Sequence, residues 1–370
     1  MAPQSSSPLR SVASERDASE ARLASLGRAL AAAAGELEQP RFLALTHESP
    51  DPDALGALVG VRTLLEEHFG YAVSIATVGE IHRAENLAMV RELGLHFADL
   101  DQLDVEGYQG VLLVDSQPGF GHTQLPENPP TLAVFDHHQA PSEGNSSLAR
   151  VPHIDVREDA GATASIVYDY LTTAGVELDV ETATALFCGV RYDTGDLSHD
   201  VSQLDEEAWY ETFRRADRQR VARIGRPSLP EVYYSELVRS LTSARRHGTL
   251  VLGLLGEVAN PESVAEMADF FLRMEGCAWS LVGGCYEGTY YVSLRTQLPG
   301  GYAYPLLERV LDGRGSFGGH GRVAGGRIPL DEDSETAVQR LESRLRARAL
   351  EILAGARGEE GSTPVGKPVC

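Results

Sequence analysis

Short apolar runs alternate with helix-forming segments between Arg41 and His138, and this alternation constrains the fold more than any other feature of the sequence. The apolar runs are RFLALTH, AVSIATV, GVLLVDS and TLAVFDHH, and helical patterns such as ALGALVGVRTLLEEHFG and AENLAMVRELG lie among them. Strands that are apolar along nearly their whole length are typical of a parallel sheet covered on both faces. The sequence therefore predicts an α/β fold, with a parallel sheet and helices on both faces.

Acidic and imidazole side chains follow three of these strands. They are His47, Asp51 and Asp53 after the first strand, Asp115 after another, and Asp136, His137 and His138 after the last. Because ligand sites of open α/β sheets lie beyond the carboxyl ends of the strands, we expect these side chains to share one edge. Taken alone, the His-His pair could equally be a polar loop that closes a core strand.

A further acidic candidate is Asp193, where the apolar helical run in ALFCGVRYDTGDLSHD ends. An array of carboxylates and imidazoles without an equal number of basic partners would repel itself unless cations bound there. Oxygen and nitrogen ligands without thiolates suit Mn²⁺ or Mg²⁺ better than structural zinc. Two such ions that share one carboxylate would polarise a phosphoryl group and activate water.

The composition limits the classes of protein that this chain can belong to. Its 370 residues, 42% hydrophobic and 23% charged, are enough for at least one large core and more plausibly two. A formal net charge of -22 argues against a broad basic face that holds long nucleic acid. The four cysteines lack CxxC spacing, and neither a signal peptide nor a membrane-spanning apolar run is present. We therefore expect a soluble, cytoplasmic protein.

Five motifs, in order from His47 to Gly195, resemble those of the DHH phosphoesterase superfamily, which is named for its Asp-His-His signature. They are HESPDPDALGA, LLVDS, FDHH, GATAS and DTG. The DHH triplet alone would be a weak signal, whereas five motifs in order are a specific one. The resemblance implies that His47 and Asp51 hold one metal ion, that Asp53, His137 and Asp193 hold the other, and that Asp115 bridges both. It ranks Asp136 and His138 behind these six, as catalytic groups that contact substrate or orient ligands.

The GATAS segment allows two interpretations. Its small residues could begin a tightly packed helix, with Thr163 or Ser165 as capping groups. The corresponding stretch of DHH proteins lies near the metal site, which implies that Gly161, Ala162 and Thr163 line the site.

A second domain is predicted to follow the run RRADRQRVARIGRPSLP, which we interpret as a solvated helix face and a connection rather than a nucleic-acid patch. The predicted division is a disordered tail over 1–17, a catalytic DHH domain with an N-terminal helix over 18–217, and a linker over 218–230. A smaller mixed α/β domain follows over 231–356, and a flexible tail over 357–370.

The C-terminal part contains a strand in GTLVLGLLGEV, a helix in SVAEMADFFLRM and a hairpin in CAWSLVGGCYEGTYYVSLRT, with its turn near Glu287 and Gly288. The following SFGGHGRVAGGRIPL is predicted to be a loop whose backbone N–H groups approach a phosphate, or else an incidental glycine-rich loop. VSLRT and GGHGRVAGG resemble the DHHA1 domain. This resemblance implies substrate contacts by Arg295, Gly318, Gly319, His320 and, more weakly, Arg322, although Phe317 stands where the family usually has a glycine.

Within the superfamily, the chain resembles the compact oligoribonucleases (nanoRNases) and pAp phosphatases more than the large RecJ exonucleases or the family II pyrophosphatases. We therefore expect a hydrolase with two Mn²⁺ ions, or Mg²⁺ or Co²⁺ in their place, that acts on short oligonucleotides or 3′,5′-bisphosphonucleotides. The alternatives are a phosphodiesterase for c-di-AMP or pApA, and a nucleotide-binding protein without turnover. We expect neither a long nucleic-acid duplex nor a membrane as a partner. The sequence is compatible with a homodimer.

Overall fold

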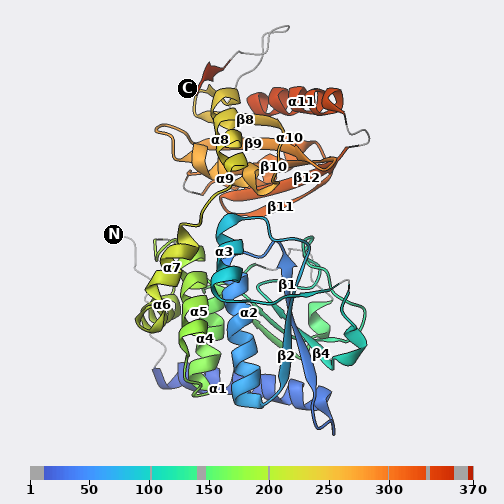
Figure 1. Cartoon of the computed structure of the whole chain (residues 1–370), viewed down its shortest axis with the longest axis vertical. Helices are drawn as coiled ribbons and strands as arrows, with labels where there is room; N and C mark the ends of the chain where they lie inside the picture. Colours follow the sequence, from blue (N-terminus) through green and yellow to red (C-terminus); the bar gives the residue numbers. More distant parts are fainter. Residues whose placement is uncertain are drawn as a thin grey trace, which may run out of the picture. The chain divides into compact units, whose positions relative to one another are not determined.

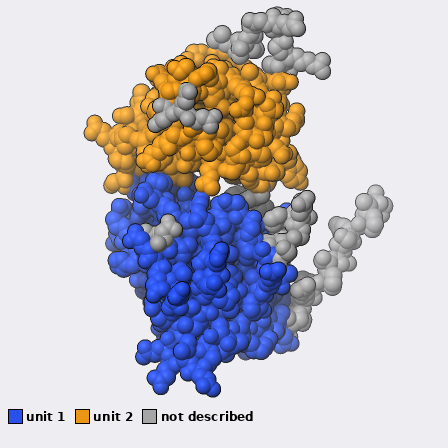
Figure 2. Space-filling model, turned by 90° about the vertical axis from the view of Figure 1, so that its right-hand side faces the viewer, with its two compact units in different colours: residues 1–227 blue, residues 228–370 orange. Residues whose placement is uncertain are grey.

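The computed structural model describes residues 12–100, 102–139, 147–198, 201–298, 300–330, 334–353 and 366–369. It divides into two compact units, Met1–Pro227 and Ser228–Cys370, which are coloured separately in Figure 2 and are described here one at a time. None of the helices in the described ranges is long and apolar enough to cross a membrane.

The first unit is built on a six-stranded sheet with the order β3-β2-β1-β4-β5-β6, in which every neighbouring pair is parallel (Figure 1). The strands are β1 (Arg41–Glu48), β2 (Ala72–Val78), β3 (Ala98–Asp99), β4 (Gly110–Val114), β5 (Thr131–Asp136) and β6 (His153–Val156). The predicted α/β fold with a parallel sheet is confirmed, although in the described residues the α-helices cover one face and only 3₁₀ helices and loops lie on the other. β1 and β4 are neighbours from which the chain continues in opposite directions, so the switch point of the sheet lies between them.

The α-helices of this unit gather on one face of the sheet. α1 (Val12–Ala34), α2 (Pro52–Leu64), α4 (Thr163–Thr173) and α5 (Val180–Asp193) contribute to one core with Phe42, Leu112 and Phe135. The opposite face, with Leu43 and Leu113, packs against loops and the 3₁₀ helices η2 (Val105–Gly107) and η3 (Leu148–Arg150). The connection from β4 to β5 contains the Pro- and Gly-rich stretch SQPGFGHTQLPENPP, which explains why no α-helix covers the sheet there.

The remaining helices of this unit pack around the first group. The π-helical turn η1 (Leu65–Phe69) extends α2, and α6 (Gln203–Arg215) lies against α4 and α5. α3 (Ala84–Glu92) and α7 (Arg218–Gly225) form a smaller core with α2 and α5. The sequence predicted a linker over 218–230. Residues 218–225 instead form α7, which packs on this core through Ile224, whose side chain is 4% exposed.

Small residues allow α2 and α5 to approach closely. A Cβ added to Gly56 would lie 2.5 Å from the carbonyl oxygen of Ala185, and one added to Gly189 would lie 3.0 Å from Asp53 Oδ1. The N-terminus of α2 therefore lies directly beside the C-terminal part of α5, which ends at Asp193. This packing brings Asp53 and Asp193 together although 140 positions separate them in the sequence.

The second unit contains a mixed seven-stranded sheet with the order β11-β12-β10-β9-β8-β7-β13. Its strands are β7 (Arg245–His247), β8 (Leu250–Glu257), β9 (Trp279–Tyr286), β10 (Thr289–Thr296), β11 (Ser316–His320), β12 (Val323–Pro329) and β13 (Lys367–Pro368). α8 (Glu231–Ser243) and α9 (Glu262–Leu272) share a core on one face, and α10 (Ala303–Leu311) and α11 (Glu335–Leu353) share a core on the other. This arrangement matches the predicted mixed α/β unit.

Two turns in this unit test the predictions made from sequence. β9 and β10 form the predicted hairpin, and the positive φ angles of Glu287 (46°) and Gly288 (73°) suit a type I′ turn. The predicted glycine-rich loop at 316–330 is wrong, because β11 and β12 pair there as a hairpin at the edge of the sheet. Glycine is required in this hairpin, since a Cβ on Gly319 would overlap the carbonyl oxygen of Val323.

The ends of the chain also differ from the predicted tails. α1 already begins at Val12, and its Leu26 and Leu30 are fully buried, as expected for a helix that packs on the core. Residues 1–11, 357–365 and 370 of the predicted tails lie outside the described residues, as do 354–356 at the end of the predicted second domain. Near the C-terminus, Lys367 and Pro368 form β13, which pairs with β7.

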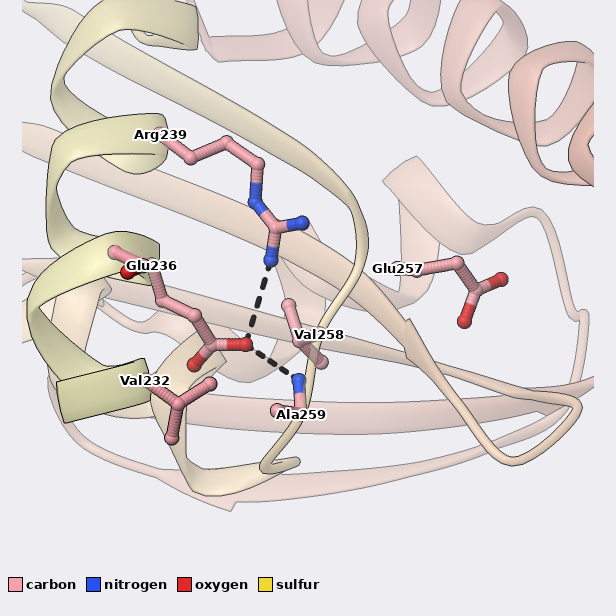
Figure 3. A pocket seen from close by; sticks show the side chains of 7 residues that line it. Val232, Glu236, Arg239, Glu257, Val258 and Ala259 are labelled. Atoms are coloured by element: carbon pink, nitrogen blue, oxygen red, sulfur yellow. Dashed lines mark hydrogen bonds and ion pairs between the residues drawn. The ribbon is translucent and has the colours of Figure 1, made fainter. Parts of the chain in front are cut away.

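A hollow in the second unit is lined by residues of α8 and of the segment after β8 (Figure 3). Glu236 is 6% exposed, and one of its carboxylate oxygens accepts hydrogen bonds from Ala259 N and Arg239. The other oxygen accepts a bond of 2.5 Å from Ser263 Oγ. Because both oxygens are engaged, we assign Glu236 a structural role that ties α8 to the start of α9.

We expect Gly56→Ala to lower the free energy of unfolding by about 1–3 kcal/mol, because the added methyl group forces α2 away from α5. Chemical denaturation of the purified protein measures this effect. Gly107→Ala is the matched control, because its Cβ would be no closer than 3.7 Å to Arg41 Nη1. Equal stability of the two variants would contradict this account of the helix packing.

Candidate metal centre

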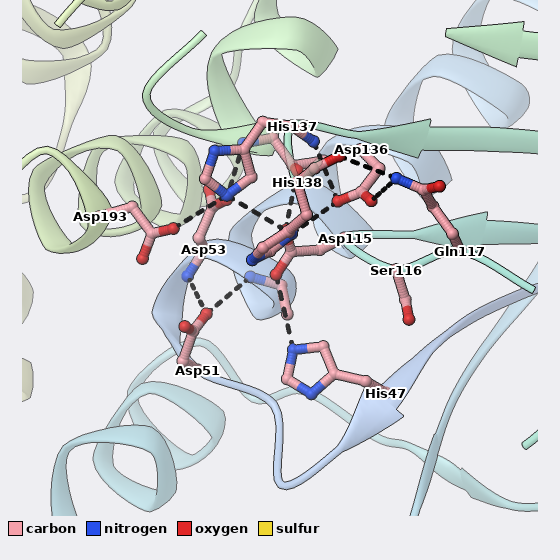
Figure 4. Close-up of polar contacts among 12 residues, drawn as sticks. His47, Asp51, Asp53, Asp115, Ser116, Gln117, Asp136, His137, His138 and Asp193 are labelled. Carbon is pink, nitrogen blue, oxygen red and sulfur yellow. Dashed lines mark hydrogen bonds and ion pairs between the residues drawn. The ribbon is translucent and has the colours of Figure 1, made fainter. Parts of the chain in front are cut away.

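The acidic and imidazole side chains that the sequence analysis identified lie close together at the edge of the first sheet where its strands end (Figure 4). β1 carries His47, the loop after β4 carries Asp115, and the segment after β5 carries His137 and His138. The N-terminus of α2 contributes Asp51 and Asp53, and the last residue of α5 is Asp193. Potential donor atoms lie within 4.8 Å of one another in three groups: His47, Asp51 and Asp115; Asp53, His137 and Asp193; and Asp115, His137 and His138.

Asp115 is the central carboxylate of this cluster. Oδ2 lies 3.5 Å from His47 Nε2, and Oδ1 lies 3.8 Å from both His137 Nε2 and His138 Nδ1. Its side chain is only 2% exposed, and its φ of 56° lies in the left-handed region that non-glycine residues rarely adopt. Backbone strain of this kind concentrates at functional sites, where the surrounding structure enforces it.

Two imidazoles are oriented by backbone carbonyl groups. His47 Nδ1 lies 2.7 Å from the carbonyl oxygen of Glu48, and His137 Nδ1 lies 3.2 Å from that of Ala160. A carbonyl oxygen only accepts, so Nδ1 of each ring carries a hydrogen, and Nε2 presents a lone pair to the cluster once it has lost its own proton. His137 Nε2 is buried without a hydrogen-bond partner and lies 3.2 Å from Asp193 Oδ2.

The carboxylates of Asp51 and Asp53 are both held at helix N-termini. Asp51 Oδ1 accepts from the N–H groups of Asp53 and Ala54, at 2.9 and 3.1 Å. Asp53 accepts from the N–H groups of Thr163 and Ala164 at the start of α4, at 2.7 and 2.9 Å. Helix N-termini favour negative charge, so these contacts help to hold two carboxylates in a crowded acidic cluster.

The GATAS segment lies at the cluster. The alternative in which Thr163 or Ser165 caps α4 is wrong, because Ala162 is at the N-cap and Asp53 supplies the capping oxygens. Thr163 Oγ1 instead donates to Asp115 Oδ1 at 2.8 Å. The site-lining interpretation of this segment therefore agrees with the geometry.

Asp136 faces away from the predicted ligands and orients the signature histidines. Its carboxylate is fully buried, and Oδ1 accepts from His137 N at 2.9 Å and from His138 Nδ1 at 2.8 Å. Gln117, which the sequence analysis missed, donates to Asp136 Oδ2 at 2.7 Å and to the carbonyl oxygen of His138 at 2.9 Å. Gln117 thus holds the signature segment in place through two hydrogen bonds. No pattern in the sequence predicts that Gln117 belongs to this network.

The loop after β4 brings two further side chains that the sequence analysis missed. The ring of His122 meets that of His47 edge-on, with centroids 5.1 Å apart and an interplanar angle of 89°. Phe120 lies between His122, at 5.6 Å, and His138, at 6.3 Å. The protein atoms around the ring, together with the positive charge of nearby His47 and His138, lower the pKa of His122 to about 4, although part of its side chain is exposed to solvent.

Burial, followed by the charge of neighbouring carboxylates, raises the pKa of three of the four aspartates. Burial and the charge of Asp115 raise the pKa of Asp51 and Asp53, and burial with the charges of Asp51 and Asp115 raises that of Asp193. Burial alone would raise the pKa of Asp115, but its hydrogen bond to His47 and the neighbouring imidazoles hold it below its usual range. Burial acts to lower the pKa of His47, yet contacts with Asp115 and Asp51 outweigh it and raise the value to about 9.

These donors fit divalent cations. Carboxylate oxygens and imidazole nitrogens, without a thiolate, suit Mn²⁺, Mg²⁺ or Co²⁺. The orphaned Nε2 of His137 and the repelling carboxylates would both gain a partner from a cation. His47, Asp51 and Asp115 form one group that could hold an ion, and Asp53, His137 and Asp193 form a second.

The predicted substrate-binding residues all lie in the second unit. Arg295 in β10 donates through Nε to Asp269 Oδ1 at 2.7 Å and through Nη1 to Ser293 Oγ at 2.6 Å, so a carboxylate that the sequence did not predict holds its guanidinium. Gly318 and Gly319 lie in β11, and Arg322 is an exposed residue between β11 and β12. The backbone of His320 ends β11, but its side chain lies outside the described part of the structure.

Comparisons with known proteins agree with this geometry. Residues 247–347 match the DHHA1 domain model. The uncharacterized protein MJ1633 of Methanocaldococcus jannaschii is 30% identical over 332 residues, which cover 88% of this chain and 66% of that protein. A probable manganese-dependent inorganic pyrophosphatase of Streptococcus agalactiae is 27% identical over 158 residues, 42% of this chain and 48% of that protein. The chain thus spans about two thirds of the first relative and about half of the second.

Two solved structures show the same fold. An exopolyphosphatase-related protein from Bacteroides fragilis superposes with a TM-score of 0.70 at 14% identity, covering 92% of this chain and 98% of that one. RecJ from Thermus thermophilus, in complex with Mn²⁺, superposes with a TM-score of 0.50 at 16% identity, covering 88% of this chain and 55% of that one. Residues 247–347 thus form a DHHA1 domain, and the chain shares the fold of these two solved structures.

We expect the affinity of the cluster for a divalent cation to fall as the pH is lowered. The raised pKa values mean that Asp51, Asp53 and Asp193 retain protons above the usual range of aspartate, and that His47 retains its proton up to about pH 9. A cation must displace these protons, so its affinity rises with pH until His47 is neutral. Calorimetric Mn²⁺ titrations in buffers of different ionisation enthalpy measure the protons released. Binding without proton release would contradict these directions.

Proposed function

We propose that this protein is a manganese-dependent phosphoesterase that hydrolyses short oligonucleotides (nanoRNA), 3′,5′-bisphosphonucleotides (pAp) or both. The observation that carries the proposal is the pair of donor groups around Asp115, which could hold two cations next to each other. Support for manganese comes from the Mn²⁺ complex of the structurally similar RecJ and from the manganese-dependent pyrophosphatase relative.

In this proposal each cation has its own protein ligands. His47 and Asp51 hold one ion, Asp53, His137 and Asp193 hold the other, and Asp115 bridges both. When bound, the two ions would polarise the phosphoryl group, activate water for in-line attack and offset the negative charge that develops on the oxygens. Mg²⁺ or Co²⁺ would fit the same oxygen and nitrogen donors.

The surrounding residues orient the groups that meet the substrate. The Nδ1–H of His138 is directed to Asp136, which in turn accepts a hydrogen bond from Gln117. Such a carboxylate contact fixes the plane of an imidazole and raises its basicity. We assign His138 to a contact with the phosphate or the leaving oxygen, and Asp136 to the positioning of His138.

Substrate length is limited by charge in this proposal. The chain has 54 acidic and 32 basic residues, and neutralisation of many phosphates needs clustered Lys and Arg. Several arginines of α6 and α7 are paired with acids, as Arg215 is with Glu211, Arg220 with Asp217 and Arg223 with Glu92. We therefore propose substrates of a few nucleotides, and not a long duplex.

Two alternatives follow from the same site. The protein could act on cyclic or linear dinucleotides such as c-di-AMP or pApA, because the metal chemistry is the same for any phosphodiester. It could also be a nucleotide-binding protein without turnover, but the presence of all six proposed ligand residues favours an enzyme.

A panel of substrates tests the function. We expect hydrolysis of pAp and of oligoribonucleotides of a few residues in Mn²⁺, with a steep fall in rate as the chain lengthens. The panel also contains pApA, c-di-AMP and inorganic pyrophosphate. Asp115→Ala should abolish turnover and metal binding, whereas the control Glu211→Gln, which alters an exposed carboxylate, should not. Preferred hydrolysis of pyrophosphate, or equal rates on long single strands, would refute the proposed substrate class.

The second unit is proposed to bind the nucleotide through Arg295, Gly318, Gly319, His320 and Arg322. A charge-assisted contact with phosphate contributes about 1.5–3 kcal/mol, so we expect Arg295→Ala to raise KM for nucleotides by roughly 10- to 100-fold. Metal content should stay the same, and bis-p-nitrophenyl phosphate, which has no nucleoside, should be affected much less. Arg273→Ala, an exposed arginine at the end of α9, is the control. Loss of bound Mn²⁺ in Arg295→Ala would contradict a role in substrate binding.

A further inference from the structure

The loop from Ser116 to Gln124 follows Asp115 directly and is tied at several points to the edge of the sheet. Gln117 anchors its first part to Asp136 and to the backbone of His138. Ser116 Oγ bonds to Thr123 Oγ1, so the two ends of the loop are joined across its base. These bonds hold the shape of the loop before any ligand binds, which lowers the entropy that binding would cost.

The second part of the loop is tied to β1. The carbonyl oxygen of His122 accepts from Glu48 N at 2.9 Å, and Gln124 Nε2 donates to Glu48 Oε1 at 2.7 Å. Phe120 and His122, between the two anchored parts, are thereby fixed beside the two ends of the cluster. The ring of His122 lies next to His47, and that of Phe120 lies next to His138.

These two rings form a short aromatic wall at the rim of the candidate metal centre. Phe120 is half-buried and His122 is exposed, so part of the wall faces solvent. An inorganic phosphate chain has no apolar surface to place against such rings. A nucleobase does, because every base has a π-face that stacks on aromatic side chains.

We infer that Phe120, supported by His122, stacks on the base of a nucleotide whose phosphate occupies the metal centre. This inference rests on the proposed function and deepens it, because it assigns a base-recognition element to the first unit. The wall would make the protein selective for nucleotides over inorganic polyphosphates, which the metal ions alone would not distinguish. It would be sequence-tolerant, since stacking does not read the hydrogen-bonding edges of a base.

The test compares dinucleotides that differ only in one base. The substrates are pApA and two analogues in which the 5′ or the 3′ base is replaced by an abasic site. Removal of a stacked base typically lowers affinity by between about fivefold and 100-fold. We expect such a rise in KM for one of the two abasic analogues with the wild-type protein. We expect Phe120→Ala to raise KM for pApA to that same level, with no further loss on that analogue.

A spectroscopic measurement separates stacking from a structural effect. A dinucleotide that carries 2-aminopurine and an uncleavable methylphosphonate linkage should lose fluorescence on binding to wild-type protein, but not on binding to Phe120→Ala. Phe120→Trp should retain both the quenching and a low KM. Tyr210→Ala, which removes an exposed aromatic ring from α6, is the control and should behave as wild type.

The outcomes distinguish this inference from the proposed function. If wild-type protein hydrolyses none of the nucleotides, the proposed function fails. If it hydrolyses pApA and both abasic analogues with equal KM, or if Phe120→Ala impairs pApA and the abasic analogues equally, the function stands and the aromatic wall is refuted. Loss of Mn²⁺ binding in Phe120→Ala would likewise assign Phe120 to the integrity of the metal centre and overturn its role in base recognition.

Discussion

The repulsion among carboxylates at one sheet edge is the constraint on which the rest of the first unit depends. Asp51, Asp53 and Asp193 meet Asp115 where burial and the charge of neighbouring carboxylates oppose the ionisation of the first three. The structure offsets this cost with the N-termini of α2 and α4, which donate to Asp51 and Asp53, and with imidazoles around Asp115. None of these contacts neutralises the cluster, so its geometry leaves a place for cations that the protein itself does not fill.

Close helix packing determines which carboxylates can meet. Asp115 and the histidines come from neighbouring strands at the switch point, where parallel strands deliver side chains to one edge by topology alone. Asp193 comes from a helix and needs α5 to approach α2 at Gly56 and Gly189. Sheet topology therefore places Asp115 and the histidines at the cluster, and the small residues between α2 and α5 allow Asp193 to reach it.

The sequence was sufficient for the parallel sheet and for the residues of the cluster, because strand ends and the helix end at Asp193 are visible in the apolar pattern. It was insufficient for Gln117, Phe120 and His122, since loop residues have no periodicity and their partners are defined only by tertiary contacts. The glycines of β11 and β12 predicted a loop because glycine has a low strand propensity, whereas pairing with β10 overrode that preference. The ion pair of Arg295 with Asp269 could not be predicted from the sequence either, because α9 and β10 come into contact only in the folded unit.

The two adjacent histidines of the signature triplet direct their ring nitrogens to different partners. His137 turns Nε2 toward Asp193 and Asp115, whereas His138 turns Nδ1 toward Asp136, although the two histidines are adjacent. Asp136 holds both in place by accepting from the backbone of one and the ring of the other. The donor groups of the cluster thus adjoin side chains that belong to none of the three groups. In the first unit these neighbours lie in the loop after Asp115, where Phe120 is next to His138 and His122 is next to His47.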